Sequence, residues 1–220
     1  DPKRYFPKLS RVMQGNLTQV NPTINSAWET VSDVARELNF ALTVRDNAVG
    51  GGQVNAELLK VEVVNSAGPF VLTSQALNEV YDAGSVQEVT WDVANTNTAP
   101  VNANTVDILL STDAGLTFPI VLANNVPNDG LHSVLLPGNA STTARIMVKA
   151  HDNIFFAVNN SNFTIQDSPI VLEFTQLEFE SCQPNDWVIP FIYKTYLGFN
   201  EEVTFSVSGV PGVLNTNFSL

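Results

Sequence analysis

The sequence predicts an all-β protein built from antiparallel β-sandwich modules. Hydrophobic residues alternate with polar ones along many short segments, as they do on strands with one buried face. Turn-forming Asp, Asn and Gly residues separate these segments at close intervals. Hydrophobic residues also make up 44% of the 220-residue chain, which is enough for packed cores and too much for a wholly disordered protein.

The first block of the sequence, residues 1–67, contains one clear β-hairpin. Hydrophobic side chains alternate over residues 40–44 and again over residues 59–63. Between them, residues 46–53 include three consecutive glycines, which a strand tolerates poorly and a loop tolerates well. Residues 32–38 are compatible with one helical turn. The block offers too few strands for a whole sandwich, so we expect the C-terminal part of a first module.

The second block, residues 68–167, offers the strands of one complete immunoglobulin- or fibronectin-like sandwich. Trp91 lies on an alternating strand and is the expected centre of its core. An inter-sheet disulfide is excluded, because the one cysteine, Cys182, lies in another block. The expected strands are residues 70–74, 87–93, 106–111, 120–123, 133–136, 144–150, 154–158 and 162–166.

The third block, residues 168–220, offers strands at residues 170–174, 187–196 and 202–208, so we expect the N-terminal part of a third module. The fold class is therefore tandem β-sandwich modules, one complete and two partial. A partial sandwich exposes an unpaired edge and an apolar face. The terminal blocks can cover these faces by packing on the central module, by pairing with each other or by exchanging strands with a second copy. We favour self-association through a terminal block. The alternative is a monomer in which the short blocks are self-sufficient small sheets. The apolar residues concerned are Phe40, Leu42, Val44, Val61, Val63, Phe174, Phe191, Phe205 and Val207.

The charge of the chain limits its partners. Acidic residues outnumber basic ones 22 to 10, for a net charge of −12. This charge repels nucleic-acid phosphates and anionic lipids, so neither class of partner is expected. No apolar run approaches the ~20 residues needed to cross a bilayer, so no membrane insertion is expected. No signal peptide is visible at Asp1, which suggests a piece of a longer chain.

No catalytic constellation is visible in the sequence. The two histidines, His132 and His151, lie in β-rich segments and do not form the His-Glu-x-x-His pattern of zinc hydrolases. The Gly-x-Ser-x-Gly elbow of serine hydrolases is also absent. We expect Cys182 to be a bystander rather than a nucleophile, since no histidine base adjoins it in the sequence.

The most specific local motif is Ser111-Thr-Asp113-Ala-Gly115-Leu-Thr-Phe118. It resembles the Asp box, Ser-x-Asp-x-Gly-x-x-aromatic, which occurs in sialidases and many other β-proteins. In such a turn the Asp carboxylate accepts backbone N–H bonds, the Gly takes a positive φ, and the aromatic residue packs beneath. We therefore expect Ser111, Asp113, Gly115 and Phe118 to be structural turn residues.

Two binding hypotheses compete with purely structural explanations. Asp46, Asn47, Asp129 and Asp152, with Asn153 beside the last, place oxygen atoms in loops, as calcium requires. Asp and Asn are also preferred turn residues, so structural calcium is the weaker explanation. Carbohydrate binding needs exposed aromatic platforms, and the candidates are Trp28, Trp187 and Tyr196. Burial in a core or between modules explains these three aromatic residues equally well.

Several longer phrases resemble a known family of proteins. Residues 4–10 (Arg-Tyr-Phe-Pro-Lys-Leu-Ser), Trp28-Glu-Thr-Val and residues 36–46 look like a segment that follows the catalytic domain in secreted, reprolysin-like zinc metallopeptidases of Bacteroidetes-type bacteria. The immunoglobulin-like module that comes next in that family resembles the second block. The phrases that carry this second likeness are residues 68–73, 89–93, 110–115 and 144–149.

The resemblance implies a non-catalytic accessory region of a secreted bacterial protease, acting as a spacer or in attachment to a substrate or surface. Its zinc ligands would lie upstream, so no catalytic residue, metal ligand or cofactor is expected in this chain. The expected partners are the upstream catalytic domain and a protein or glycan substrate. The alternative is a module of a cell-surface adhesin or carbohydrate-binding array, which would have the same composition.

Overall fold

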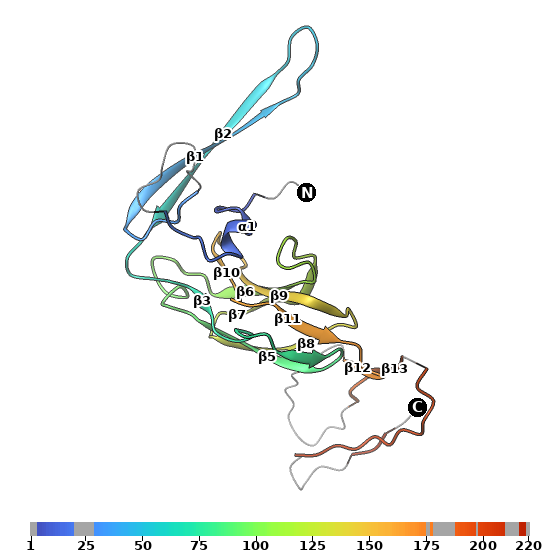
Figure 1. The fold of residues 1–220 in the computed structure, drawn as a ribbon. Helices are drawn as coiled ribbons and strands as arrows, with labels where there is room; N and C mark the ends of the chain where they lie inside the picture. The colour runs from blue at the N-terminus through green and yellow to red at the C-terminus, as the bar shows by residue number, and fades with distance from the viewer. Residues whose placement is uncertain are drawn as a thin grey trace.

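The computed structural model describes residues 4–19, 29–174, 177, 188–196, 198–209 and 216–218. The fold is all-β, as predicted, with one short helix (Figure 1). The elements in chain order are α1 (Leu9–Val12), β1 (Arg36–Arg45), β2 (Val54–Val63), β3 (Val71–Leu72), β4 (Val80–Asp82), β5 (Val86–Asp92), β6 (Thr105–Ser111), β7 (Ile120–Pro127), β8 (Leu131–Leu135), β9 (Ser141–Ala150), β10 (Phe156–Val158), β11 (Phe163–Gln166), β12 (Ile170–Phe174) and β13 (Phe191–Thr195).

Strands β3 to β11 form a two-layer sandwich, and all of them lie within residues 68–167. One sheet has the order β4-β11-β9-β6-β7, with β10 also paired to β9. The other has the order β3-β5-β8. All pairs are antiparallel except β11 with β4, which is parallel. The central part of the chain is thus a sandwich with an immunoglobulin-like number of strands.

The core of the sandwich lies between these two sheets. Val89 and Trp91 face it from β5, and Ile108 and Val148 face it from β6 and β9. The expected core position of Trp91 is confirmed, since its side chain is 4% exposed. Its indole Nε1–H donates to Oδ1 of Asn128 at 2.8 Å, so the polar edge of this buried ring is satisfied.

The predicted N-terminal hairpin is present and is longer than expected. Strands β1 and β2 pair over all ten positions, from Arg36↔Val63 to Arg45↔Val54. The hairpin projects from one end of the sandwich (Figure 1), and most of its residues are exposed. Leu42 is 67% exposed and Val44 is 60% exposed, so within the described residues the alternation does not build a core there. Self-association through this block stays a prediction.

A short N-terminal segment, residues 4–19, lies between the hairpin and the sandwich (Figure 1). It includes α1. The ring of Phe6 contacts that of Phe40 on β1, with centroids 5.5 Å apart. The ring of Tyr5 contacts that of Phe156 on β10, with centroids 5.3 Å apart. The segment therefore touches both the hairpin and the sandwich.

The C-terminal hairpin, β12–β13, lies at the opposite end of the sandwich (Figure 1). Val171 on β12 is 3% exposed and packs against Gly84, where an added Cβ would lie only 2.5 Å from Val171 Cγ1. Aromatic rings cover β13: Phe191 contacts Phe174, Phe205 and Phe218.

Two sequence-based expectations about secondary structure are wrong, and one strand was not expected. Residues 202–208 do not form a strand; Phe205 instead packs on Phe191 and Tyr193 without a hydrogen-bonded neighbour strand. Residues 32–38 contain no helical turn, because β1 already begins at Arg36. Strand β4 was not expected, since its three residues lack an alternating pattern and pair with β11, distant in sequence. In the described ranges, no helix has the length and hydrophobicity required to cross a bilayer.

Candidate functional site

The face of the larger sheet that points away from the core carries an unusual buried charge. Strand β9 sends Ile146 and Val148 into the core, so the residues between them point to the outer face. Outer-face residues of a sandwich are normally solvated, yet Arg145 is 9% exposed and Met147 is fully buried. Something other than the second sheet therefore covers this part of β9.

Residues 4–19 provide that cover. Residues 12–15 line one side of a cavity, and Arg145, Val158, Asn159 and Asn160 line the other. The volume of the cavity is about 200 Å³. Next to it, Met13 packs on Gly115, where an added Cβ would lie 2.1 Å from Met13 Sδ. The cavity is therefore formed between two parts of the chain that are distant in sequence.

The loop after β10 fixes the side chain of Arg145. Its Nε–H donates to Oδ1 of Asn162 at 2.6 Å, and Nη1 donates to the backbone oxygen of Asn159 at 2.6 Å. The side chain of Asn159 is buried and accepts the backbone N–H of Ile146 at 2.9 Å. Burial lowers the pKa of Arg145 from its ordinary value. In the described part of the chain, no Asp or Glu forms an ion pair with this guanidinium.

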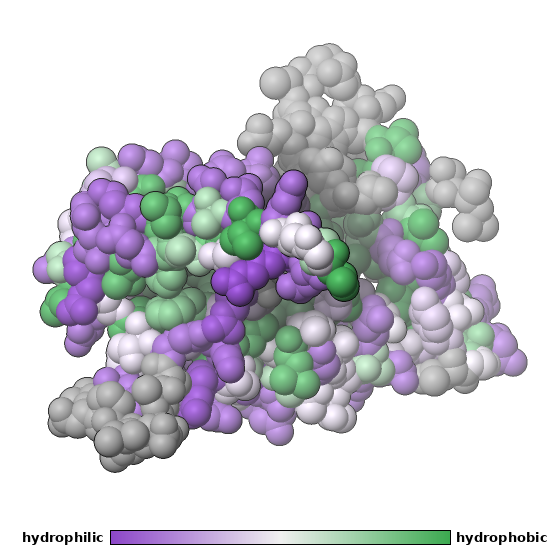
Figure 2. All heavy atoms as spheres, turned by 90° about the horizontal axis from the view of Figure 1, so that it is seen from above, coloured by the Kyte–Doolittle hydropathy of each residue, from purple (hydrophilic) through white to green (hydrophobic). Residues whose placement is uncertain are grey.

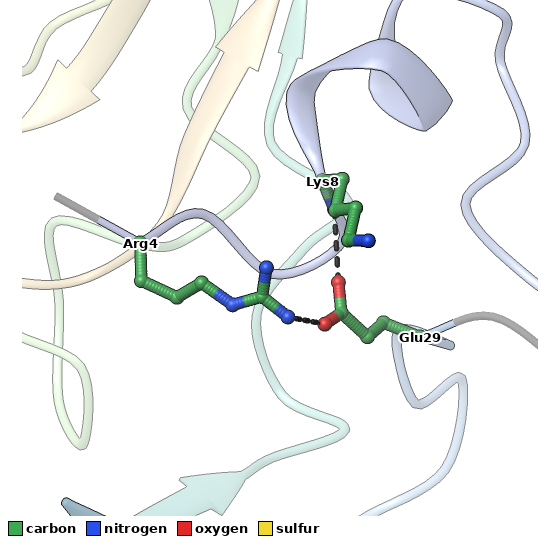
Figure 3. A network of polar contacts seen from close by, with 3 residues as sticks. All are labelled: Arg4, Lys8 and Glu29. Atoms are coloured by element: carbon green, nitrogen blue, oxygen red, sulfur yellow. Dashed lines mark hydrogen bonds and ion pairs between the residues drawn. The ribbon is translucent and has the colours of Figure 1, made fainter.

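An ionic clamp holds the N-terminal segment in place (Figure 3). One carboxylate oxygen of Glu29 accepts a hydrogen bond from the Arg4 guanidinium, with which it also forms an ion pair. The other oxygen accepts the backbone N–H of Lys8 at 3.0 Å. Two residues later, the backbone N–H of Val31 donates to the oxygen of Leu17 at 2.9 Å. Residues 29–31 thus tie together both ends of the segment that covers β9.

The Asp-box motif forms a tight turn after β6. Ser111 Oγ–H donates to Oδ1 of Asp113 at 2.6 Å and accepts the backbone N–H of Gly115 at 2.9 Å. Asp113 also accepts the backbone N–H of Thr117 at 2.9 Å and its hydroxyl at 2.6 Å. Gly115 has φ +82°, which a glycine adopts without strain. Phe118 is half-buried. Ser111, Asp113 and Gly115 are thus part of a hydrogen-bonded turn, and this turn also carries the contact with Met13. The expected packing of Phe118 beneath the turn stays a prediction.

The hydrogen bonds of the turn favour the ionised form of Asp113. Burial by itself raises the pKa of this carboxyl group. Hydrogen bonds from Ser111 and from the side chain and backbone of Thr117 oppose burial and outweigh it. The pKa of Asp113 therefore lies below its ordinary value.

The calcium candidates lie in separate loops. Asp46 Oδ1 accepts the N–H groups of Ala48 and Gln53 in the β1–β2 loop, where Asn47 has φ +51°. Asp129 accepts the N–H of Leu131 at 3.3 Å in the β7–β8 turn. Asp152 lies in the turn after β9. Among the residues that the structure describes, no three His, Cys, Asp or Glu side chains are grouped to hold a metal ion.

The two histidines occupy different positions on the sandwich. His151 Nδ1 lies 2.7 Å from Oδ1 of Asp107, whose carboxylate also accepts the backbone N–H of Asn125 at 2.9 Å. His132 lies on β8 opposite Val89. The structure therefore does not bring the two histidines together as a ligand pair.

The aromatic candidates for glycan binding are only partly within the described residues. Tyr196 is 41% exposed beside β13. Trp28, Trp187 and Cys182 lie outside the described residues. Figure 2 shows the molecule from the side of the hairpin, where hydrophobic and hydrophilic residues are interspersed.

Sequence analysis did not identify Arg145 as a functional candidate. An arginine at an outward position of a strand ordinarily extends into water. The sequence contains one weak sign that the outer face of β9 is covered. Met147, two residues after Arg145 and on the same face, is a hydrophobic residue that is seldom left in water. That pair indicates a covered outer face, but it does not show that residues 12–15 provide the cover.

The comparisons with known proteins do not assign this site. A scan against protein-family models finds no match, and a search among curated proteins finds no matching relative. The site consists of one buried guanidinium, hydrogen-bonded to Asn159 and Asn162, beside a cavity that residues 12–15 also line.

Proposed function

We propose that this chain is a non-catalytic accessory region of a secreted bacterial zinc metallopeptidase, where it acts as a spacer or attaches a substrate or surface. The resemblance of its longer phrases to the region after the catalytic domain motivates the proposal. The upstream catalytic domain would be its partner, and the zinc would belong to that domain.

One structural observation supports the spacer role most directly. The N-terminal segment contacts the hairpin through Phe6 and the sandwich through Tyr5 and Met13. Glu29, which precedes the hairpin in the chain, holds the same segment through Arg4 and the backbone of Lys8. Contacts of this kind restrict how one block moves relative to the next, which is what a spacer requires.

The first test uses the purified 220-residue chain. We expect no hydrolysis of casein and no bound zinc by elemental analysis. Chelator-sensitive cleavage of casein, or one zinc ion per chain, would contradict the proposal. The same cleavage assay on an intact parent protease should show activity, which serves as the positive control.

A second test separates the spacer from attachment to a glycan. An adhesin or carbohydrate-binding module would bind immobilised glycans through exposed aromatic rings, and Tyr196 is such a ring. The whole chain and its Tyr196→Ala variant are compared on a glycan array. Binding that Tyr196→Ala abolishes would favour the adhesin, as would tandem copies of these modules in the parent gene. A His-Glu-x-x-His segment encoded upstream would favour the protease.

A further inference from the structure

The positive charge of the Arg145 guanidinium has no acidic partner among the described residues. Buried charges in proteins are almost always paired with an opposite charge. Arg145 is 9% exposed, and its two hydrogen-bond acceptors, Asn162 Oδ1 and the Asn159 oxygen, are both neutral. The positive charge is therefore hydrogen-bonded but is not neutralised by the residues that the structure describes.

The same guanidinium retains unused donors. A guanidinium has five N–H groups, and Arg145 uses one on Nε and one on Nη1. Within the described ranges, both N–H groups of Nη2 and one of Nη1 have no acceptor. Arg145 lines the cavity of about 200 Å³, so a small group inside could reach these donors.

The surroundings of the cavity favour an anion. None of the described residues that line the cavity is acidic, and Arg145 is the charged residue among them. Arg4 on the covering segment is already paired with Glu29, so the positive charge at the cavity comes from Arg145. Gln14 and Asn160 add neutral polar side chains to the lining. A positive charge in a partly enclosed recess attracts a small anion more strongly than the same charge would in open water.

We propose that the cavity between residues 12–15 and strand β9 is a binding site for a small carboxylate, with Arg145 as its anchor. One guanidinium matches the single negative charge of a carboxylate. The fork of planar N–H donors pairs with two carboxylate oxygens in one plane. The carboxylate belongs either to a free organic acid or to an acidic side chain of a bound peptide. This inference does not depend on the proposed protease role.

The test is an NMR titration of the whole chain with sodium acetate, balanced by sodium chloride to constant ionic strength. We expect saturable shifts of the backbone amides of Ile146, Asn159 and Asn160, with no such shifts in sodium chloride alone. In Arg145→Gln the affinity for acetate should fall by about ten- to a hundredfold, because a charged hydrogen-bonding anchor is lost. Arg145→Lys should retain part of the binding, because it keeps the charge and loses the fork.

A second variant covers the case in which Arg145 substitutions unfold the loop at Asn159. Val12→Phe fills the cavity from the covering segment and leaves the hydrogen bonds of Arg145 intact, so it should also abolish the acetate response. Val44→Phe, on the exposed hairpin, is the matched control and should bind acetate like the parent chain. Shifts that do not saturate, or that persist unchanged in Arg145→Gln and Val12→Phe, would overturn the proposal.

The source of the carboxylate is distinguished by a parallel titration. N-acetyl-aspartate amide presents the same carboxylate on a peptide-like body. Equal responses to acetate and to this compound would indicate that acidic side chains enter the site. A response to acetate alone would indicate a free small acid. A response to neither would leave the cavity as a water-filled space and the proposal wrong.

Discussion

The sandwich and the N-terminal hairpin have the same sequence pattern and very different burial. In β5, Val89 is fully buried and Trp91 is 4% exposed. In β1, Leu42 and Val44 alternate in the same way, yet more than half of each side chain is exposed. The period of two shows which residues share a face of a strand; it does not show that another layer covers that face.

The difference between the two regions comes from the number of layers. The sandwich sheets face each other and enclose one continuous cluster. The hairpin is a single two-stranded sheet, and the ring of Phe6 packs on Phe40 near the middle of β1. Two strands that are packed over only part of their length gain little stability of their own in water. The hairpin should therefore contribute little to the free energy of unfolding of the sandwich.

A matched pair of truncations tests this comparison with the largest expected effect. Ile108→Ala removes a fully buried side chain from the sandwich, and we expect it to lower the free energy of unfolding by about 2–5 kcal/mol. Leu42→Ala removes a similar volume from the hairpin, and we expect a change within about 0.5 kcal/mol. Urea denaturation followed by tryptophan fluorescence and circular dichroism measures both. Equal costs would show that the hairpin face is covered in solution.

A second pair compares turn aspartates from the same two regions. Asp113 is bonded to Ser111 and Thr117 inside the Asp-box turn, and Asp113→Ala should cost about 1–3 kcal/mol. Asp46 accepts two backbone N–H groups in the exposed hairpin loop. Asp46→Ala should leave the melting temperature of the sandwich unchanged. If Asp113→Ala also left the melting temperature unchanged, the Asp box would have no structural role in the sandwich.

The lowered pKa of Asp113 also predicts a pH dependence in the sandwich. Since the pKa of Asp113 in the folded state lies below its ordinary value, the folded state favours the carboxylate. The stabilisation is fully present above the unfolded pKa and is lost as the pH falls through the folded pKa. Acid titrations of thermal stability should therefore show a steeper loss below pH 3.8 for the parent chain than for Asp113→Asn. Parallel curves for the two proteins would contradict this.

The smallest expected effect concerns the connection between the regions. Glu29→Gln keeps the shape of the side chain and removes the charge that pairs with Arg4. We expect at most about 1 kcal/mol of lost stability, because the partners are partly exposed. Hydrogen exchange should be faster at the Val31 amide and unchanged at Val148 in the core. Protection that is unaltered at Val31 would mean that the clamp does not hold the segment.

The sequence allowed the prediction of elements whose signals are local. Three glycines between two alternating runs predicted the β1–β2 hairpin, and Trp91 on an alternating strand predicted a core residue. The Asp-box spacing predicted the hydrogen bonds of Asp113 with the turn. In each case the residues that matter lie within a few positions of one another.

The remaining features depend on contacts between distant residues. Strand β4 exists because β11 pairs with it. The alternation at 203–207 reflects the packing of Phe205 on other rings and not a strand. Arg145 lines a cavity together with residues 12–15, which no local pattern relates to β9. Hydrophobic residues alternate with polar ones in the same way whether one face of the strand contacts water, aromatic rings or a segment distant in the sequence.

The long separation between residues 12–15 and β9 also has a consequence for biosynthesis. A ribosome makes residues 4–19 well before it makes Arg145 and the Asn159 loop, so this segment has to wait without its native contacts while the sandwich is completed. Closing a loop of that size is slow compared with forming a local hairpin. Docking of the segment should therefore be a late folding event, and during that delay its exposed Phe6, Leu9 and Met13 are available to a chaperone.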